Sequence, residues 1–234
     1  MQQITHIFKR EFASYFLSPI AYIVISIFLL VTGWFFFTTF FLYNQANLRN
    51  FFALLPLVFS FVIPAITMRL FSEEISTGSY EVLLTMPVTF LDAVLGKFLA
   101  GVAFVAAALI PTLAYPITVS FLGRLDWGPV VGGYIGAILL GGAFSAIGLF
   151  ASSLTRNQIT AFIIGMAICF TLTLIDKMLF FLPRSMLGVL EYIGSDFHFQ
   201  NISKGIIDSR DILYFLSVIF VGLYAAHMAI QQKN

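Results

Sequence analysis

The 234-residue chain is 60% hydrophobic and only 10% charged, whereas about a quarter of the residues are charged in an ordinary soluble domain. This composition excludes a soluble globular protein. The formal net charge is +1, and the sequence has no block of basic residues. Such a chain has no electrostatic footprint for a phosphate backbone, so nucleic acid is not expected as a partner.

The charged residues leave six long uncharged runs along the sequence. A helix needs roughly 20 apolar residues to cross the hydrocarbon core of a membrane, and each run is about that long or longer. We therefore predict an all-α membrane protein with a single transmembrane domain over residues 1–234. The six predicted spans are about 19–42, 51–68, 94–120, 130–154, 159–175 and 212–230.

Residues 1–18 precede the first span and show a different pattern. Apolar residues recur every four positions at Ile4, Phe8, Phe12 and Phe16. Lys9 and Arg10 fall on another face. The pattern predicts an amphipathic helix with a basic polar face, which favours a position in the headgroup layer. A solvated N-terminal tail is the alternative.

The fourth predicted span is rich in small residues at helical spacing. They are Gly132, Gly133, Gly136, Ala137, Gly141 and Ser145. Small residues let the backbones of neighbouring membrane helices approach closely. The stripe predicts a helix-packing face, and its neighbour is either another span of this chain or a second subunit.

No catalytic, metal-binding or nucleotide-binding motif is recognisable in the sequence. The Gly96-Lys97 pair lacks the preceding glycine and the following Ser or Thr of a phosphate-binding loop. Lys97 is instead expected near the start of the third span, with its ammonium group at the membrane interface. His198 stands alone, with no second ligand at metal spacing. We expect neither an enzyme nor a bound cofactor or metal in this chain.

The spans lack the mid-membrane carboxylates that ion-coupled transporters use. Energy for any transport would then have to come from a partner. Between the second and third spans, residues 69–81 fit a short amphipathic helix with exposed carboxylates that breaks at Gly78. Such a helix would dock a soluble partner. The alternative is that its charges only terminate the two spans.

The same region carries a family resemblance. The stretch MRLFSEEISTGSYEVLLTMPVTFLDAVLGKFLAG at 68–101 resembles the membrane subunits of type-2 ABC transporters. KREFASYFLSPIAYIV at 9–24 is similar to that family's first interfacial helix, and GIIDSRDILYFLS at 205–217 is similar to the start of its sixth span. Within the family, the short permeases of gliding-motility type are the nearest in length and layout.

The resemblance implies a permease subunit of an ABC exporter that is driven by separate ATPase subunits. The transmembrane path would be formed with a second permease, either an identical chain or a paralogue with a large outer domain. ATP and Mg²⁺ would be bound by the ATPase subunits. The alternative function is a non-transporting membrane anchor that couples ATPase action to periplasmic or cell-envelope proteins.

The resemblance also implies roles for particular segments. A coupling helix that contacts the ATPase is implied between the second and third spans. Its residues would be Phe71, Ser72, Glu73, Glu74, Ile75, Thr77, Gly78 and Glu81. Short re-entrant helices are implied between the fifth and sixth spans, over the apolar clusters at 178–182 and 186–190.

The orientation in the membrane also follows from the resemblance. The positive-inside rule does not decide it, because the predicted spans leave six cationic residues on each side. The family arrangement implies a bacterial inner-membrane protein with both termini in the cytoplasm.

Overall fold

The computed structural model describes residues 2–43, 47–78, 89–178, 192–206 and 208–232. All regular secondary structure in these residues is helical, and six helices are long and apolar enough to cross a membrane. The predicted all-α membrane fold with six candidate spans is confirmed. The spans are Pro19–Leu42, Arg49–Thr77, Phe90–Leu122, Trp127–Leu154, Gln158–Met178 and Ser209–Gln231.

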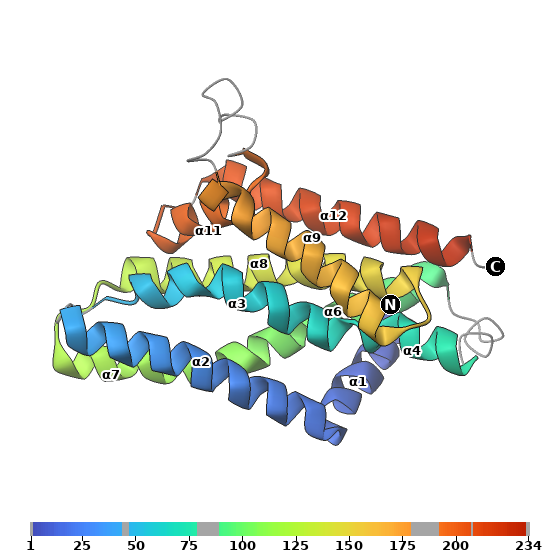
Figure 1. Cartoon of the computed structure of the whole chain (residues 1–234), viewed down its shortest axis with the longest axis horizontal. Helices are drawn as coiled ribbons and strands as arrows, with labels where there is room; N and C mark the ends of the chain where they lie inside the picture. The colour runs from blue at the N-terminus through green and yellow to red at the C-terminus, as the bar shows by residue number, and fades with distance from the viewer. Residues whose placement is uncertain (1, 44–46, 79–88, 179–191, 207, 233–234) are drawn as a thin grey trace.

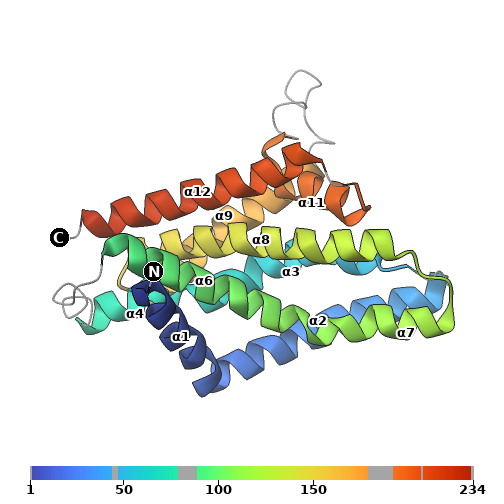
Figure 2. The same ribbon diagram turned by 180° about the vertical axis from the view of Figure 1, so that it is seen from behind.

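The helices run roughly along one long axis, and both ends of the described chain lie at the same end of the bundle as the first and fourth helices (Figures 1 and 2). In chain order they are α1 (Gln2–Leu17), α2 (Pro19–Tyr43), α3 (Arg49–Thr67), α4 (Arg69–Thr77), α6 (Phe90–Leu109), α7 (Ala114–Leu122), α8 (Trp127–Leu154), α9 (Gln158–Met178), α11 (Ser195–Ser203) and α12 (Ser209–Gln231). A 3₁₀ turn, η1 (Pro111–Leu113), joins α6 to α7.

Helix α8 lies at the centre of the bundle. It contacts α3, α4, α6, α9, α11 and α12. In its most apolar stretch 78% of the residues are buried, compared with 22% in α2 and 17% in α12. The outer helices expose large apolar side chains such as Trp34, Phe41 and Phe220. Exposed apolar surface on spans of this length suits contact with lipid.

Small residues allow α8 to occupy this central position. A Cβ atom at Gly133 would overlap the ring of Phe52 on α3, and one at Gly141 would lie 2.6 Å from Val105 on α6. At both positions the close neighbour is another helix of this chain. The other small residues of the predicted stripe, all buried, are Gly132, Gly136, Ala137 and Ser145.

The third span differs from the expected range of 94–120 at its start and has a break inside it. Helix α6 begins at Phe90 because Thr89 and Asp92 form a capping box, in which each side chain accepts a hydrogen bond from the other's backbone N–H. The α-helix ends before Pro111, which opens η1, and α7 then continues. Proline cannot donate the backbone hydrogen bond that an unbroken helix would require.

Two predicted features lie outside the described residues. One is Glu81. The other is the pair of apolar clusters at 178–182 and 186–190, of which only Met178, the last residue of α9, is described. The re-entrant helices therefore stay a prediction.

Candidate functional site

Helix α4 has one buried face and one exposed face, as its alternation of apolar and acidic residues requires. Leu70 and Phe71 are buried, whereas Glu73 is exposed. The helix ends at Gly78, whose φ of +72° lies in the left-handed region that glycine adopts without strain. It follows α3 directly, with Met68 alone between the two helices.

The joint between α3 and α4 is fixed by Ser152 of α8. The Ser152 hydroxyl donates to the carbonyl oxygen of Met68 at 2.7 Å. It accepts from the backbone N–H groups of Phe71 at 2.9 Å and Ser72 at 3.0 Å. The N–H of Phe71 lies in the first turn of α4, where it has no partner within the helix. One hydroxyl therefore caps α4 and ties it to the central helix.

Lys97 of α6 is buried between α1 and α4, with 1% of its surface exposed. Its Nζ donates to Glu74 Oε1 at 2.8 Å, to Glu11 Oε1 at 3.1 Å and to the carbonyl oxygen of Leu70 at 2.7 Å. An ammonium group has three N–H donors, and here all three are used. The group also lies over the ring of Phe71, 5.1 Å from its centroid. Lys97 thus joins three helices at one point.

Arg10 completes the cluster on its exposed side. Its guanidinium donates to Glu11 Oε1 at 2.9 Å and to Glu74 Oε1 at 3.3 Å. Burial alone would raise the pKa of Glu11, but the positive charges and hydrogen bonds of Lys97 and Arg10 outweigh it and lower that pKa below its ordinary value. Two cations and two carboxylates therefore form one network, and Glu11 is held in its ionised form.

Close contact between α1 and α6 brings these charges together. Gly96 faces Ile7, and a Cβ atom at Gly96 would lie 2.8 Å from the Ile7 side chain. Farther along, the ring of Tyr15 lies 5.1 Å from that of Phe104. The guanidinium of Arg69 lies 4.9 Å from the centroid of the Tyr15 ring, which links α1 to the start of α4.

The residues predicted for the interfacial helix all lie on α1. Lys9 and Arg10 are exposed. The apolar series is half-buried, with Phe8, Phe12 and Phe16 packed against the protein core. Part of the face assigned to lipid headgroups is thus covered by the protein itself, and residence of α1 in the headgroup layer stays a prediction.

The residues predicted for the coupling helix divide into two groups. Phe71 and Ser72 are buried, and Glu74 turns towards Lys97 with 18% of its side chain exposed. Ile75 is half-buried against the core. The exposed group is Glu73, Thr77 and Gly78, together with Ser76, which the prediction omitted. Only the exposed group has surface to offer a partner.

The expected position of Lys97 was wrong. Sequence reasoning placed its ammonium group at the membrane interface, but the structure buries it among carboxylates. Its partner Glu11 was also missed. The pairs join residues 86 and 23 positions apart, and no local pattern reports contacts of that length. The available signal was one lysine near the start of a span, preceded in the sequence by two amphipathic segments that each contain a glutamate.

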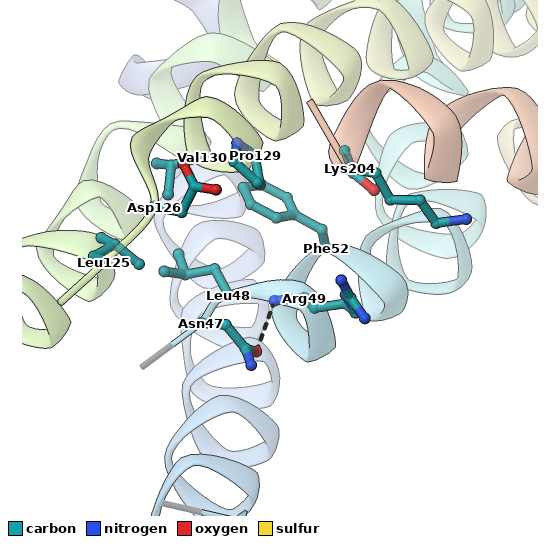
Figure 3. A pocket seen from close by; sticks show the side chains of 10 residues that line it. Asn47, Leu48, Arg49, Phe52, Leu125, Asp126, Pro129, Val130 and Lys204 are labelled. Atoms are coloured by element: carbon teal, nitrogen blue, oxygen red, sulfur yellow. Dashed lines mark hydrogen bonds between the residues drawn. The ribbon is translucent and has the colours of Figure 1, made fainter. Parts of the chain in front are cut away.

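A pocket of about 160 Å³ lies at the end of the bundle opposite α1 and α4. It brings together the start of α3, the turn before α8 and the end of α11. In Figure 3, Arg49 and Lys204 lie on one side of the pocket and Asp126 on the other. The lining residues are Asn47, Leu48, Arg49, Phe52, Leu125, Asp126, Pro129, Val130, Ser203 and Lys204.

Within the described part of the chain, no group of three His, Cys, Asp or Glu residues is suited to a metal ion.

Comparison with known families decides the class of the protein. The model of the family described as ABC-2 family transporter protein matches residues 39–219, which is most of the chain. The chain belongs to this family. No curated protein matches the sequence. As an ABC-2 family member with six candidate spans, the chain is a multi-pass membrane component of an ABC transporter. The match includes α4 and Lys97 but begins after α1.

Proposed function

We propose that this ABC-2 family protein is one permease half of an ABC exporter. Two permease subunits would form the transmembrane path, and two ATPase subunits would bind ATP and Mg²⁺ and drive the pair between inward-open and outward-open states. The second permease is an identical chain or a paralogue with a large outer domain, as in gliding-type complexes. In this proposal the protein lies in the bacterial inner membrane with both termini in the cytoplasm.

The division of α4 into two faces carries the proposal. The exposed face, with Glu73 and Ser76, is available to a soluble partner at the end of the bundle where both chain ends lie. The other face is fixed to α8 through Ser152 and to α6 through Lys97. An ATPase that docks on the exposed face would therefore act on several helices at once.

The contacts behind α4 suggest how movement is transmitted. A displacement of α4 must either carry Lys97 and Ser152 with it or break buried hydrogen bonds, and breaking them leaves polar groups without partners. If α4 moves as a rigid unit with the adjoining ends of α1, α6 and α8, these hydrogen bonds are kept. Such a movement therefore costs less free energy than one that breaks them. Such shifts of packed helices belong to the known repertoire of switching transitions.

Charge reversal at Glu73 tests the docking face. The experiment purifies the chain from its native membrane with any ATPase that accompanies it, and measures binding and ATPase stimulation for Glu73→Lys. We expect an affinity loss of about tenfold or more, because the reversal puts a cation where the partner meets a carboxylate. The control is Gln231→Lys, which introduces the same side chain at an exposed position at the end of α12 and changes the charge by one unit where Glu73→Lys changes it by two.

Two results would contradict the proposal. One is the absence of any co-purifying ATPase. The other is equal ATPase stimulation by wild type and Glu73→Lys when both variants insert into the membrane to the same extent.

A further inference from the structure

His198 and Asp211 form a buried pair at the end of the bundle opposite α1 and α4. His198 lies on α11 with 1% of its surface exposed, and Asp211 lies in the first turn of α12 with 3% exposed. His198 Nδ1 is 2.6 Å from Asp211 Oδ1. Sequence reasoning considered only a second metal ligand near His198 and did not identify this carboxylate partner, which lies 13 positions along the chain.

Both ring nitrogens of His198 face hydrogen-bond acceptors. The second nitrogen, Nε2, lies 3.1 Å from the carbonyl oxygen of Tyr192, and a carbonyl oxygen can only accept. Nε2 must therefore carry a hydrogen. A hydrogen is also required between Nδ1 and the carboxylate, because two lone pairs at 2.6 Å would repel. The pair thus holds one proton more than a neutral histidine and an ionised aspartate would hold.

The surroundings favour that proton on the imidazole. An unperturbed imidazole is more basic than a carboxylate by roughly 2.5 pH units. The His198 ring stacks on Tyr214 at a centroid distance of 4.1 Å, and the rings of Tyr192 and Phe197 stand steeply to it at centroid distances of 5.1 and 5.4 Å. The face of the stacked Tyr214 ring stabilises a cation at this position. Asp211 Oδ2 is buried and has no hydrogen-bond partner among the described residues, so the imidazolium is the charge that balances this carboxylate.

Other charged groups lie near the pair, and the carboxylate of Asp176 is close enough to interact electrostatically with His198. On α9, Asp176 accepts from the backbone N–H of Phe197, and Lys177 pairs with Asp196 of α11 at 3.3 Å. On α12, Asp208 caps the helix through the backbone N–H of Arg210. The hydroxyl of Tyr214 donates to the carbonyl oxygen of Ile193. Asp208 and Arg210 also line a pocket of about 280 Å³ beside the pair.

We propose that His198 and Asp211 form a proton-binding site that fastens α11 to α12. With the proton bound, an imidazolium-carboxylate pair and the Tyr192 carbonyl hold the two helices and the preceding residues together. When the imidazolium loses a proton, the carboxylate keeps the hydrogen on Nδ1 and the one on Nε2 leaves. Nε2 and the Tyr192 carbonyl oxygen then face each other as two acceptors, and the contact between α11 and the residues before it loosens. The site is independent of the exporter role proposed for α4.

Nitrogen NMR of the three histidines of the chain tests proton binding directly. The full chain, labelled with ¹⁵N-histidine, is placed in lipid nanodiscs, and the His198 signals are assigned by their loss in His198→Gln. His6 is exposed and serves as the internal reference. At a pH of about 7.5, where an exposed histidine is mostly neutral, we expect both nitrogens of His198 to be protonated. A neutral His198 at that pH would overturn the proposal.

Two variants separate proton binding from packing. In Asp211→Asn the partner charge is lost, and we expect the signal of the doubly protonated His198 to be lost at the same pH. Asp208→Asn is the matched control, because asparagine caps a helix as well as aspartate does and Asp208 does not bond to His198.

Amide hydrogen exchange in α11, measured at fixed pH, tests whether the His198–Asp211 pair fastens α11 to α12. We expect exchange in Ser195–Ser203 to accelerate about tenfold or more in Asp211→Asn and to stay near wild type in Asp208→Asn. Equal protection of α11 in all three proteins would overturn the fastening role.

Discussion

Both ends of the bundle bury a cationic nitrogen between helices, but they surround it differently. At the α1/α4 end, Lys97 meets two carboxylates and a carbonyl oxygen, and Arg10 adds a second cation at the exposed edge. At the α11/α12 end, His198 meets one carboxylate and a carbonyl oxygen inside a set of aromatic rings. Lys97 joins helices that are distant in sequence, whereas His198 joins two consecutive helices.

The difference lies in how each end responds to protons. An ammonium group loses its proton only in strongly alkaline solution, whereas imidazole titrates near neutral pH. The Lys97 end is therefore suited to a permanent connection, and it lies behind the helix proposed to receive the ATPase. The His198 end is suited to a connection that depends on its proton. One type of contact thus serves two purposes.

The largest effect is expected from Lys97→Met, which keeps the length of the side chain but removes its charge. Glu11 and Glu74 would lose their buried cation, and breaking such a group by removing one partner costs about 3 kcal/mol or more. Unfolding of the detergent-solubilised chain by denaturant measures the loss. Lys9→Met, at an exposed position on α1, is the control. Equal stability of the two variants would show that the cluster does not hold this end together.

Two glycine substitutions on α6 test how closely α1 packs against this helix. In Gly96→Ala the new Cβ would lie 2.8 Å from Ile7, and we expect a loss of about 2 kcal/mol from overpacking. In Gly101→Ala the new Cβ would meet Ser145 at 3.4 Å, an ordinary contact. Both variants gain helix propensity equally, so the difference between their unfolding free energies isolates the contact. No difference would argue against tight packing of α1 on α6.

The joint between α3 and α4 is expected to contribute less to the free energy of unfolding than the contact of α1 with α6. Ser152→Ala removes three hydrogen bonds made by one hydroxyl, at a net cost of about 1 kcal/mol or somewhat more. Ser153→Ala is the matched control, since that buried hydroxyl donates to Phe150 within its own helix. Hydrogen exchange of the first turn of α4 should rise in the first variant. A similar rise in the second variant would contradict the role given to Ser152.

The smallest effect is a pH dependence of stability at the α1/α4 end. The pKa of Glu11 is lower in the folded protein than its ordinary value, so its contribution to stability is present above the ordinary glutamate range near about 4.3 and is lost as the pH falls below it. Glu11→Gln should remove this acid sensitivity of unfolding. Acid sensitivity that persists in Glu11→Gln would assign it to another group.

The sequence alone was enough for the spans and for α4 because their signals are local. Uncharged runs and the alternation around Glu73 depend on neighbouring residues. The two buried cations depend on contacts between distant residues, such as Lys97 with Glu11. A lone lysine or histidine carries no local mark of a partner on another helix. The sequence did carry a sign of which acidic residue on α4 points inward, because Glu74 lies four positions after Leu70 and three after Phe71 and so shares their face of the helix.

The two faces of α4 can be tested directly by photocrosslinking in the complete transporter. A photoreactive residue would be placed at exposed Glu73 or Ser76, at half-buried Ile75, and at exposed Gln231 of α12 as a control. The account predicts adducts with the ATPase from positions 73 and 76 and little or none from positions 75 and 231. Equal adduct yields at all four positions, or no ATPase adduct from 73 and 76, would contradict it.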